Sequence, residues 1–167
     1  GHIEPGDTVQ ILYQYTDTTF FTPYTFYDFD DVKNAYGEPF DPATGTISSE
    51  LTLAAQFAFL NGAFQVVCVA VNPSNPASPT VGEYSVALDK LKDDPMIAVV
   101  VPCTGQQPLH QLVQEHVKAQ SENRFGRRAI LGLDGTTTPV SSSQRIIDAG
   151  ELSDRRIILV SPATFKY

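Results

Sequence analysis

Residues 96–133 read MIAVVVPCTGQQPLHQLVQEHVKAQSENRFGRRAILGL and contain a complete strand–helix–strand pattern. The apolar run at residues 96–101 has the length and composition of a buried strand. Residues 108–121 place Leu109, Leu112 and Val117 on one helical face. Residues 129–133 form the next strand. The stretch therefore predicts a right-handed crossover between two parallel strands.

The same alternation extends on both sides of this unit. Further strands are predicted at residues 65–71 (QVVCVAV) and 156–160, and further helices at residues 83–92 and 142–149. We therefore expect an α/β fold with a mainly parallel sheet of about four core strands flanked by helices. The strand at 65–71 should be buried on both faces.

The region before residue 65 supplies four more elements. Residues 8–15 (TVQILYQY) and 24–27 are rich in β-formers, and they should pair as an N-terminal β-hairpin. A short helix at 28–37 begins with Asp28 and ends at Gly37, and a longer helix at 48–60 is followed by Asn61 and Gly62.

Composition and charge exclude some classes of protein. The chain has 167 residues, 11 Lys and Arg against 19 Asp and Glu, and a formal net charge of -8. Nucleic-acid binding is disfavoured by this charge, and the basic cluster at Arg124, Arg127 and Arg128 is interpreted as the solvated end of a helix. No apolar run reaches the length that a membrane span needs.

The domain prediction is simple. Residues 1–2 (Gly-His) resemble a remnant of tag cleavage, and residues 3–167 should form a single globular α/β domain. Cys68 and Cys103 lie in or just after apolar runs, so both are interpreted as small buried residues. A disulfide between them is the alternative if their strands are neighbours.

The search for enzyme chemistry finds no strong motif. Phosphate-binding loops and the hydrolase nucleophile elbow are absent. His110 and His116 lie six residues apart, too far around a helix to bind one metal together, and both are interpreted as surface or boundary residues. We predict no catalytic, cofactor-binding or metal-binding residues. The alternative is a small α/β enzyme or ligand-binding domain whose site lies at the strand C-terminal ends, at Thr104, Asp134 and Ser161.

Several segments, taken in order, resemble one family. Residues 26–37 (FYDFDDVKNAYG) are similar to a short helix that ends in Tyr/Phe-Gly. Residues 53–63 (LAAQFAFLNGA) with the strand at 65–71 resemble a helix ending in Asn-Gly-Gly before an apolar strand. Residues 87–102 resemble a leucine-containing helix followed by aspartate, a strand and a proline, and residues 154–162 resemble a later strand that also ends near a proline. Together these segments resemble the central domain of contractile tail sheath proteins of bacteriophages and related contractile injection systems.

This resemblance carries several expectations. The chain would be part of a longer structural protein without its terminal arms, located in the virion and assembled in the host bacterial cytoplasm. Its partners would be neighbouring sheath subunits and the tail tube, and residues 1–167 alone would be monomeric. Contraction would drive the tube through the host envelope with energy stored in the extended lattice. The family's central domain is similar in fold to subtilisin, but the sequence contexts of a subtilisin-type triad are missing here.

Overall fold

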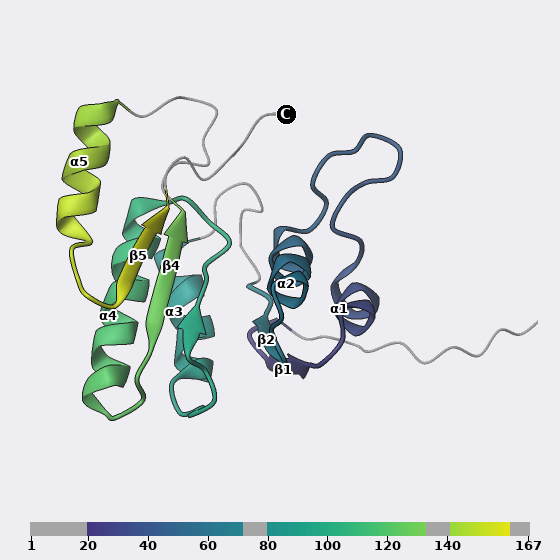
Figure 1. Cartoon of the computed structure of the whole chain (residues 1–167), viewed down its shortest axis with the longest axis horizontal. Coiled ribbons are helices and arrows are strands. Elements are labelled where there is room, and N and C mark those ends of the chain that lie inside the picture. The colour runs from purple at the N-terminus through teal and green to yellow at the C-terminus, as the bar shows by residue number, and fades with distance from the viewer. Residues whose placement is uncertain (1–19, 72–79, 133–140, 161–167) are drawn as a thin grey trace, which may run out of the picture.

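The computed structural model describes residues 20–71, 80–132 and 141–160. Within them lie five helices and two small sheets, which occupy different halves of the molecule (Figure 1). The predicted strand at residues 8–15 falls outside the described residues.

The first half is built on an antiparallel pair of strands. β1 (Pro23–Phe26) pairs with β2 (Val66–Val69), so that Phe26 lies opposite Val66. Two helices, α1 (Phe29–Tyr36) and α2 (Glu50–Leu60), connect these strands. The small hydrophobic core of this half consists of Phe26, Val32, Ala55 and Cys68.

The sequence predicts both helices of this half, although α2 begins at Glu50, two residues later than expected. The side chain of Asp28 accepts a hydrogen bond from the backbone N–H of Asp30, and Ser49 caps α2 in the same way. Gly37 and Gly62 follow the two helices with φ of 84° and 86°, a conformation that favours glycine.

The second half is the three-stranded parallel sheet. The strands β3 (Val99–Val100), β4 (Arg128–Gly132) and β5 (Ile157–Val160) lie in the order β3-β4-β5. Its helices are α3 (Val81–Leu91), α4 (Gln107–Glu122) and α5 (Ser142–Glu151). This confirms the α/β fold and the strand–helix–strand unit of residues 96–133.

The main core lies between this sheet and two of its helices. α3 and α4 pack behind the strands in the view of Figure 1. The buried members of this core are Leu88, Val100, Val113, Val117, Ala129, Leu131 and Leu152. Every strand residue among them points to the same side of the sheet, because side chains alternate along a strand.

Two sequence predictions about strands need correction. The apolar segment containing β2 does not join the parallel sheet, which therefore has three described strands where about four were expected. Its hydrogen bonds go instead to β1, the strand that was expected to pair with residues 8–15. β2 is also not buried on both faces: only Cys68 within it is fully buried.

Candidate functional site

Of the three residues in the alternative enzyme site, the structure describes only Thr104, which follows β3. Its hydroxyl accepts a hydrogen bond from the backbone N–H of Gln106 at 3.3 Å. Its carbonyl oxygen lies 2.8 Å from Nε2 of His110. The hydroxyl oxygen and the carbonyl oxygen of Thr104 thus both accept hydrogen bonds at the start of α4. Asp134 and Ser161 lie outside the described residues.

His110 occupies the first turn of α4 and is fully buried, so its interpretation as a surface or boundary residue is wrong. Because a carbonyl oxygen can only accept, Nε2 carries the proton in this contact. Nδ1 is buried without a hydrogen-bond partner. Burial lowers the pKa of His110, so the ring is neutral at physiological pH.

The two cysteines are free thiols. Burial raises the pKa of Cys68 to about 12 and that of Cys103 to about 11. Cys103 donates a weak hydrogen bond to the carbonyl of Glu50, 3.8 Å away, and so connects the loop after β3 to the start of α2. Thiols with such pKa values are protonated at neutral pH and are poor nucleophiles.

The basic cluster differs from its sequence interpretation at one position. Arg124 and Arg128 are exposed, but Arg127 is only 1% exposed. Its Nη2 donates to the carbonyls of Leu91, Lys92 and Asp94 at 2.7, 3.1 and 2.6 Å. A cation at these carbonyls caps the C-terminal end of α3.

His116 is the fourth partner of Arg127. The distance from Nη1 of Arg127 to Nε2 of His116 is 2.8 Å. Burial and the adjacent guanidinium lower the pKa of His116 to about 4, against the opposing effect of Asp89. The half-buried position of His116 agrees with its interpretation as a boundary residue. The pair is a structural contact within the fold.

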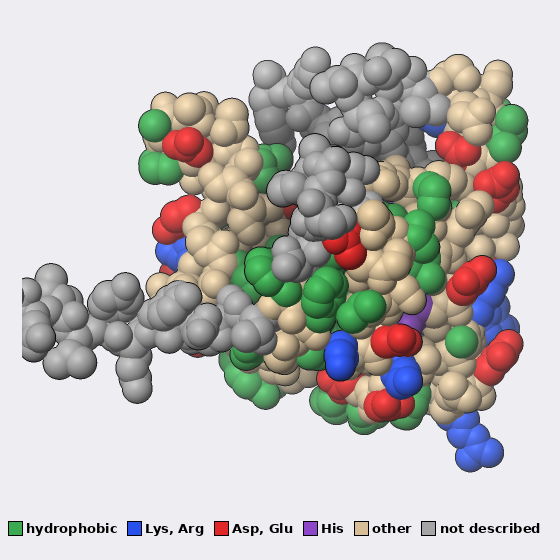
Figure 2. Space-filling view, turned by 180° about the vertical axis from the view of Figure 1, so that it is seen from behind, with side chains coloured by type: hydrophobic (Ala, Val, Ile, Leu, Met, Phe, Trp, Pro, Cys, Tyr) green, Lys and Arg blue, Asp and Glu red, His purple; other side chains and the backbone are tan. Residues whose placement is uncertain are grey.

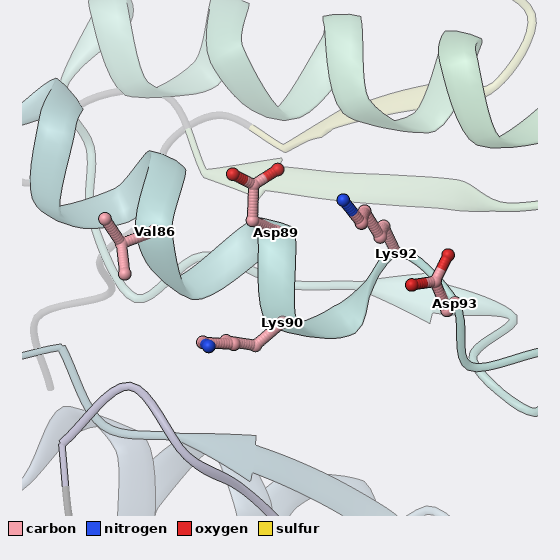
Figure 3. A pocket seen from close by; sticks show the side chains of 5 residues that line it. All are labelled: Val86, Asp89, Lys90, Lys92 and Asp93. Carbon is pink, nitrogen blue, oxygen red and sulfur yellow. The ribbon is translucent and has the colours of Figure 1, made fainter.

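One surface depression lies along α3 and is lined by Val86, Asp89, Lys90, Lys92 and Asp93. Figure 3 shows that these side chains do not converge: Asp89 and Lys92 extend to one side of the helix end, whereas Lys90 extends to the other. Such an open, mixed-charge surface lacks the enclosed apolar walls that small-molecule sites usually have.

The described residues hold no candidate metal site and no candidate membrane span. Across residues 20–71, 80–132 and 141–160, no group of three or more His, Cys, Asp and Glu side chains could hold a metal ion. No helix in those ranges is both long and apolar enough to cross a bilayer. Figure 2 shows acidic and basic side chains interspersed on the face it displays, without the basic stripe typical of nucleic-acid binders.

The most unusual surfaces of the described residues are apolar. Around α2, the side chains of Tyr27, Phe57, Leu60 and Phe64 are 57 to 82% exposed. The rings of Tyr27 and Phe64 pack edge to face with centroids 5.8 Å apart. The sequence held a signal for the exposure of Phe57 and Leu60, since α2 has apolar residues on more than one side and only one side can face the core.

The second surface, called here the open sheet face, is the side of the parallel sheet opposite the main core. Its apolar side chains are Val99, Val101, Ile130, Ile158 and Val160, and the exposed Arg128 lies on the same side at the start of β4. Val101 is 53% exposed and Ile158 is 47% exposed. Among the described helices, none crosses this side of the sheet, which faces the viewer in Figure 1.

Comparison with known proteins gives a match over the whole chain. All 167 residues align at 48% identity with a protein named tail sheath protein from Mycobacterium phage Bxz1, and they span 28% of that protein's length. No family model matches the chain. The match confirms the resemblance to tail sheath proteins that residues 26–37, 53–71, 87–102 and 154–162 indicated.

Proposed function

We propose that this chain is one segment of a contractile phage tail sheath, a structural layer that surrounds the tail tube. The observation that carries the proposal is 48% identity to a tail sheath protein over every residue of the chain. On contraction, the sheath would drive the tube through the host envelope. The segment corresponds to a single globular domain of a longer protein, to which it contributes structure without catalysis.

The partners in this proposal are neighbouring sheath subunits and the tail tube. The assembled protein would be part of the virion, after assembly in the host bacterial cytoplasm. The large exposed apolar side chains support the proposal that this chain packs against other protein surfaces. Monomeric proteins rarely expose extended apolar patches to water. The net charge of -8 favours solubility before assembly and disfavours a nucleic-acid partner.

Energy for contraction would come from the lattice itself. If the extended array is less stable than the contracted one, contraction needs no nucleotide hydrolysis. The chain's lack of a phosphate-binding loop motif agrees with this mechanism.

The test is electron microscopy of the full-length protein after expression and purification. We expect helical tubes of stacked rings, whose diameter increases on contraction, while residues 1–167 alone stay monomeric. Full-length protein that never polymerises, even with its tail tube, would contradict the proposal. An enzymatic site at Thr104, Asp134 and Ser161 would then be the next hypothesis, although the hydroxyl and carbonyl oxygens of Thr104 each already accept a hydrogen bond.

A further inference from the structure

The open sheet face follows from the topology of the parallel sheet. Its strands succeed one another in the order β3-β4-β5, always stepping in the same direction. Strand-to-strand crossovers are right-handed, so α4 and α5 must both leave toward the same side. The helix α3 packs against α4 on that side. The strand order and the right-handed crossovers therefore leave the opposite face of the sheet without a helix from these crossovers.

Most of this face has the composition of a protein interior. Arg128 is charged and lies at the start of β4, but Val101, Ile130, Ile158 and Val160, toward the carboxyl ends of the strands, carry no polar side-chain atom. Because parallel sheets occur almost only with both faces covered, these side chains need a partner surface. Their β-branched side chains would pack well against an apolar helix, which is the usual cover of a parallel sheet.

Either a neighbouring subunit or a segment of the same polypeptide could cover this face. The two would cover it at different stages, during assembly or during folding. A neighbouring subunit would leave it exposed until assembly, and a subunit with an exposed parallel sheet would be prone to aggregate. A segment of the same polypeptide would cover it during folding. The matched tail sheath protein has more than two-thirds of its length outside the aligned part, which is ample chain to supply a helix.

We propose that the open sheet face is covered in the full-length protein by a helix of the same polypeptide that lies outside residues 1–167. The helix packs its apolar side on Val101 of β3's end, Ile130 of β4 and Ile158 of β5. This arrangement completes a three-layer α/β domain within one subunit. It concerns the interior of the subunit and does not depend on whether the assembled protein contracts.

The test is site-specific photocrosslinking in the full-length protein. A diazirine-bearing amino acid replaces Ile158, and a second variant carries it at Val101. The matched control position is Ala119, which is exposed on α4 and lies on the other side of the sheet. Unlabelled and ¹⁵N-labelled subunits are mixed before irradiation, so that mass spectrometry separates crosslinks within one subunit from those between subunits.

The expected result is a crosslink from positions 158 and 101 to one common segment outside residues 1–167, within a single subunit and before any assembly. Position 119 should give no crosslink to that segment. Crosslinks only between isotopically different subunits would overturn the proposal in favour of a neighbouring copy. Crosslinks confined to residues 1–167, or reaction with water alone, would overturn it too. The tubes expected of the sheath are scored separately, so either proposal can fail alone.

Discussion

Nη1 of Arg127 lies 2.8 Å from Nε2 of His116, and this contact joins the start of β4 to the middle of α4. Arginine has only donors, so the imidazole must accept with Nε2 and carry its proton on Nδ1. The same guanidinium holds three carbonyls at the end of α3. One side chain therefore ties two helices and a strand together.

Replacing Arg127 should strongly destabilise the protein. Arg127→Met keeps much of the apolar stem but leaves the carbonyls of Leu91, Lys92 and Asp94 without their donor. We expect a loss of about 3 kcal/mol in the free energy of unfolding, since orphaned buried acceptors are costly and these bonds involve a charged group. Urea unfolding followed by circular dichroism measures the difference.

The matched control for Arg127 is Arg128, its exposed neighbour. Arg128→Met should change the free energy of unfolding by less than about 0.5 kcal/mol, as is usual for surface positions. Equal effects of the two substitutions would show that the buried contacts of Arg127 do not stabilise the fold.

Stability should fall between pH 6.5 and about pH 4. The pKa of His116 is about 4 in the folded protein against 6.5 in an ordinary environment, so the unfolded chain binds the extra proton first as the pH falls. This contribution is complete above pH 6.5 and is lost progressively below it. The lowered pKa of His110 acts in the same direction.

Urea midpoints across this pH range test the pH dependence. His116→Gln keeps an acceptor for Arg127 and cannot titrate, so its midpoint should vary less with pH than that of the parent protein. His110 stays in this variant as the source of the remaining slope. An unchanged slope would show that His116 does not titrate abnormally. Below pH 4 the carboxylates with lowered pKa values, Asp41 and Asp154, add their own losses.

Local signals in the sequence predicted local structure well. Asp28 and Gly37 bracket α1 as expected, and the apolar spacing of Leu109, Leu112 and Val117 predicted α4, in which Leu109 and Val117 are buried. These features depend on residues within a few positions of one another. Helix capping and helical periodicity are fixed at that range.

Tertiary contacts could not be predicted from the sequence, because they join residues that are far apart along the chain. Arg124, Arg127 and Arg128 look alike in sequence, and only the fold brings Arg127 to the end of α3, more than 30 residues away. The apolar run of β2 predicted a strand but could not specify its partner, which proved to be β1. The continuous apolar run at residues 65–71 also predicted burial on both faces, whereas within β2 only Cys68 is buried.

Gly62 should resist substitution for reasons of backbone conformation alone. Its φ is 86°, and a Cβ atom added there would meet nothing within 4 Å. Gly62→Ala should therefore cost about 1 kcal/mol, the penalty of a left-handed conformation for an L-residue. Gly126 offers the control, because its surroundings are equally open and its φ lies outside the left-handed region. Gly126→Ala should be neutral or slightly stabilising in the same thermal-unfolding assay.

The reactivity of the Cys103 thiol tests for an enzymatic site at the end of β3. A pKa of about 11 against an ordinary value of 9.0 lowers the thiolate fraction at pH 7.5 by about 100-fold, because each unit is a factor of ten. Iodoacetamide should therefore alkylate Cys103 about 100 times more slowly than a free model thiol, and Cys68 more slowly still. Mass spectrometry resolves the two sites, and unfolding in urea should make their rates alike. Rapid alkylation of Cys103 in the folded protein would instead reveal an activated thiol beside Thr104, and that result would favour the enzymatic alternative over a purely structural role.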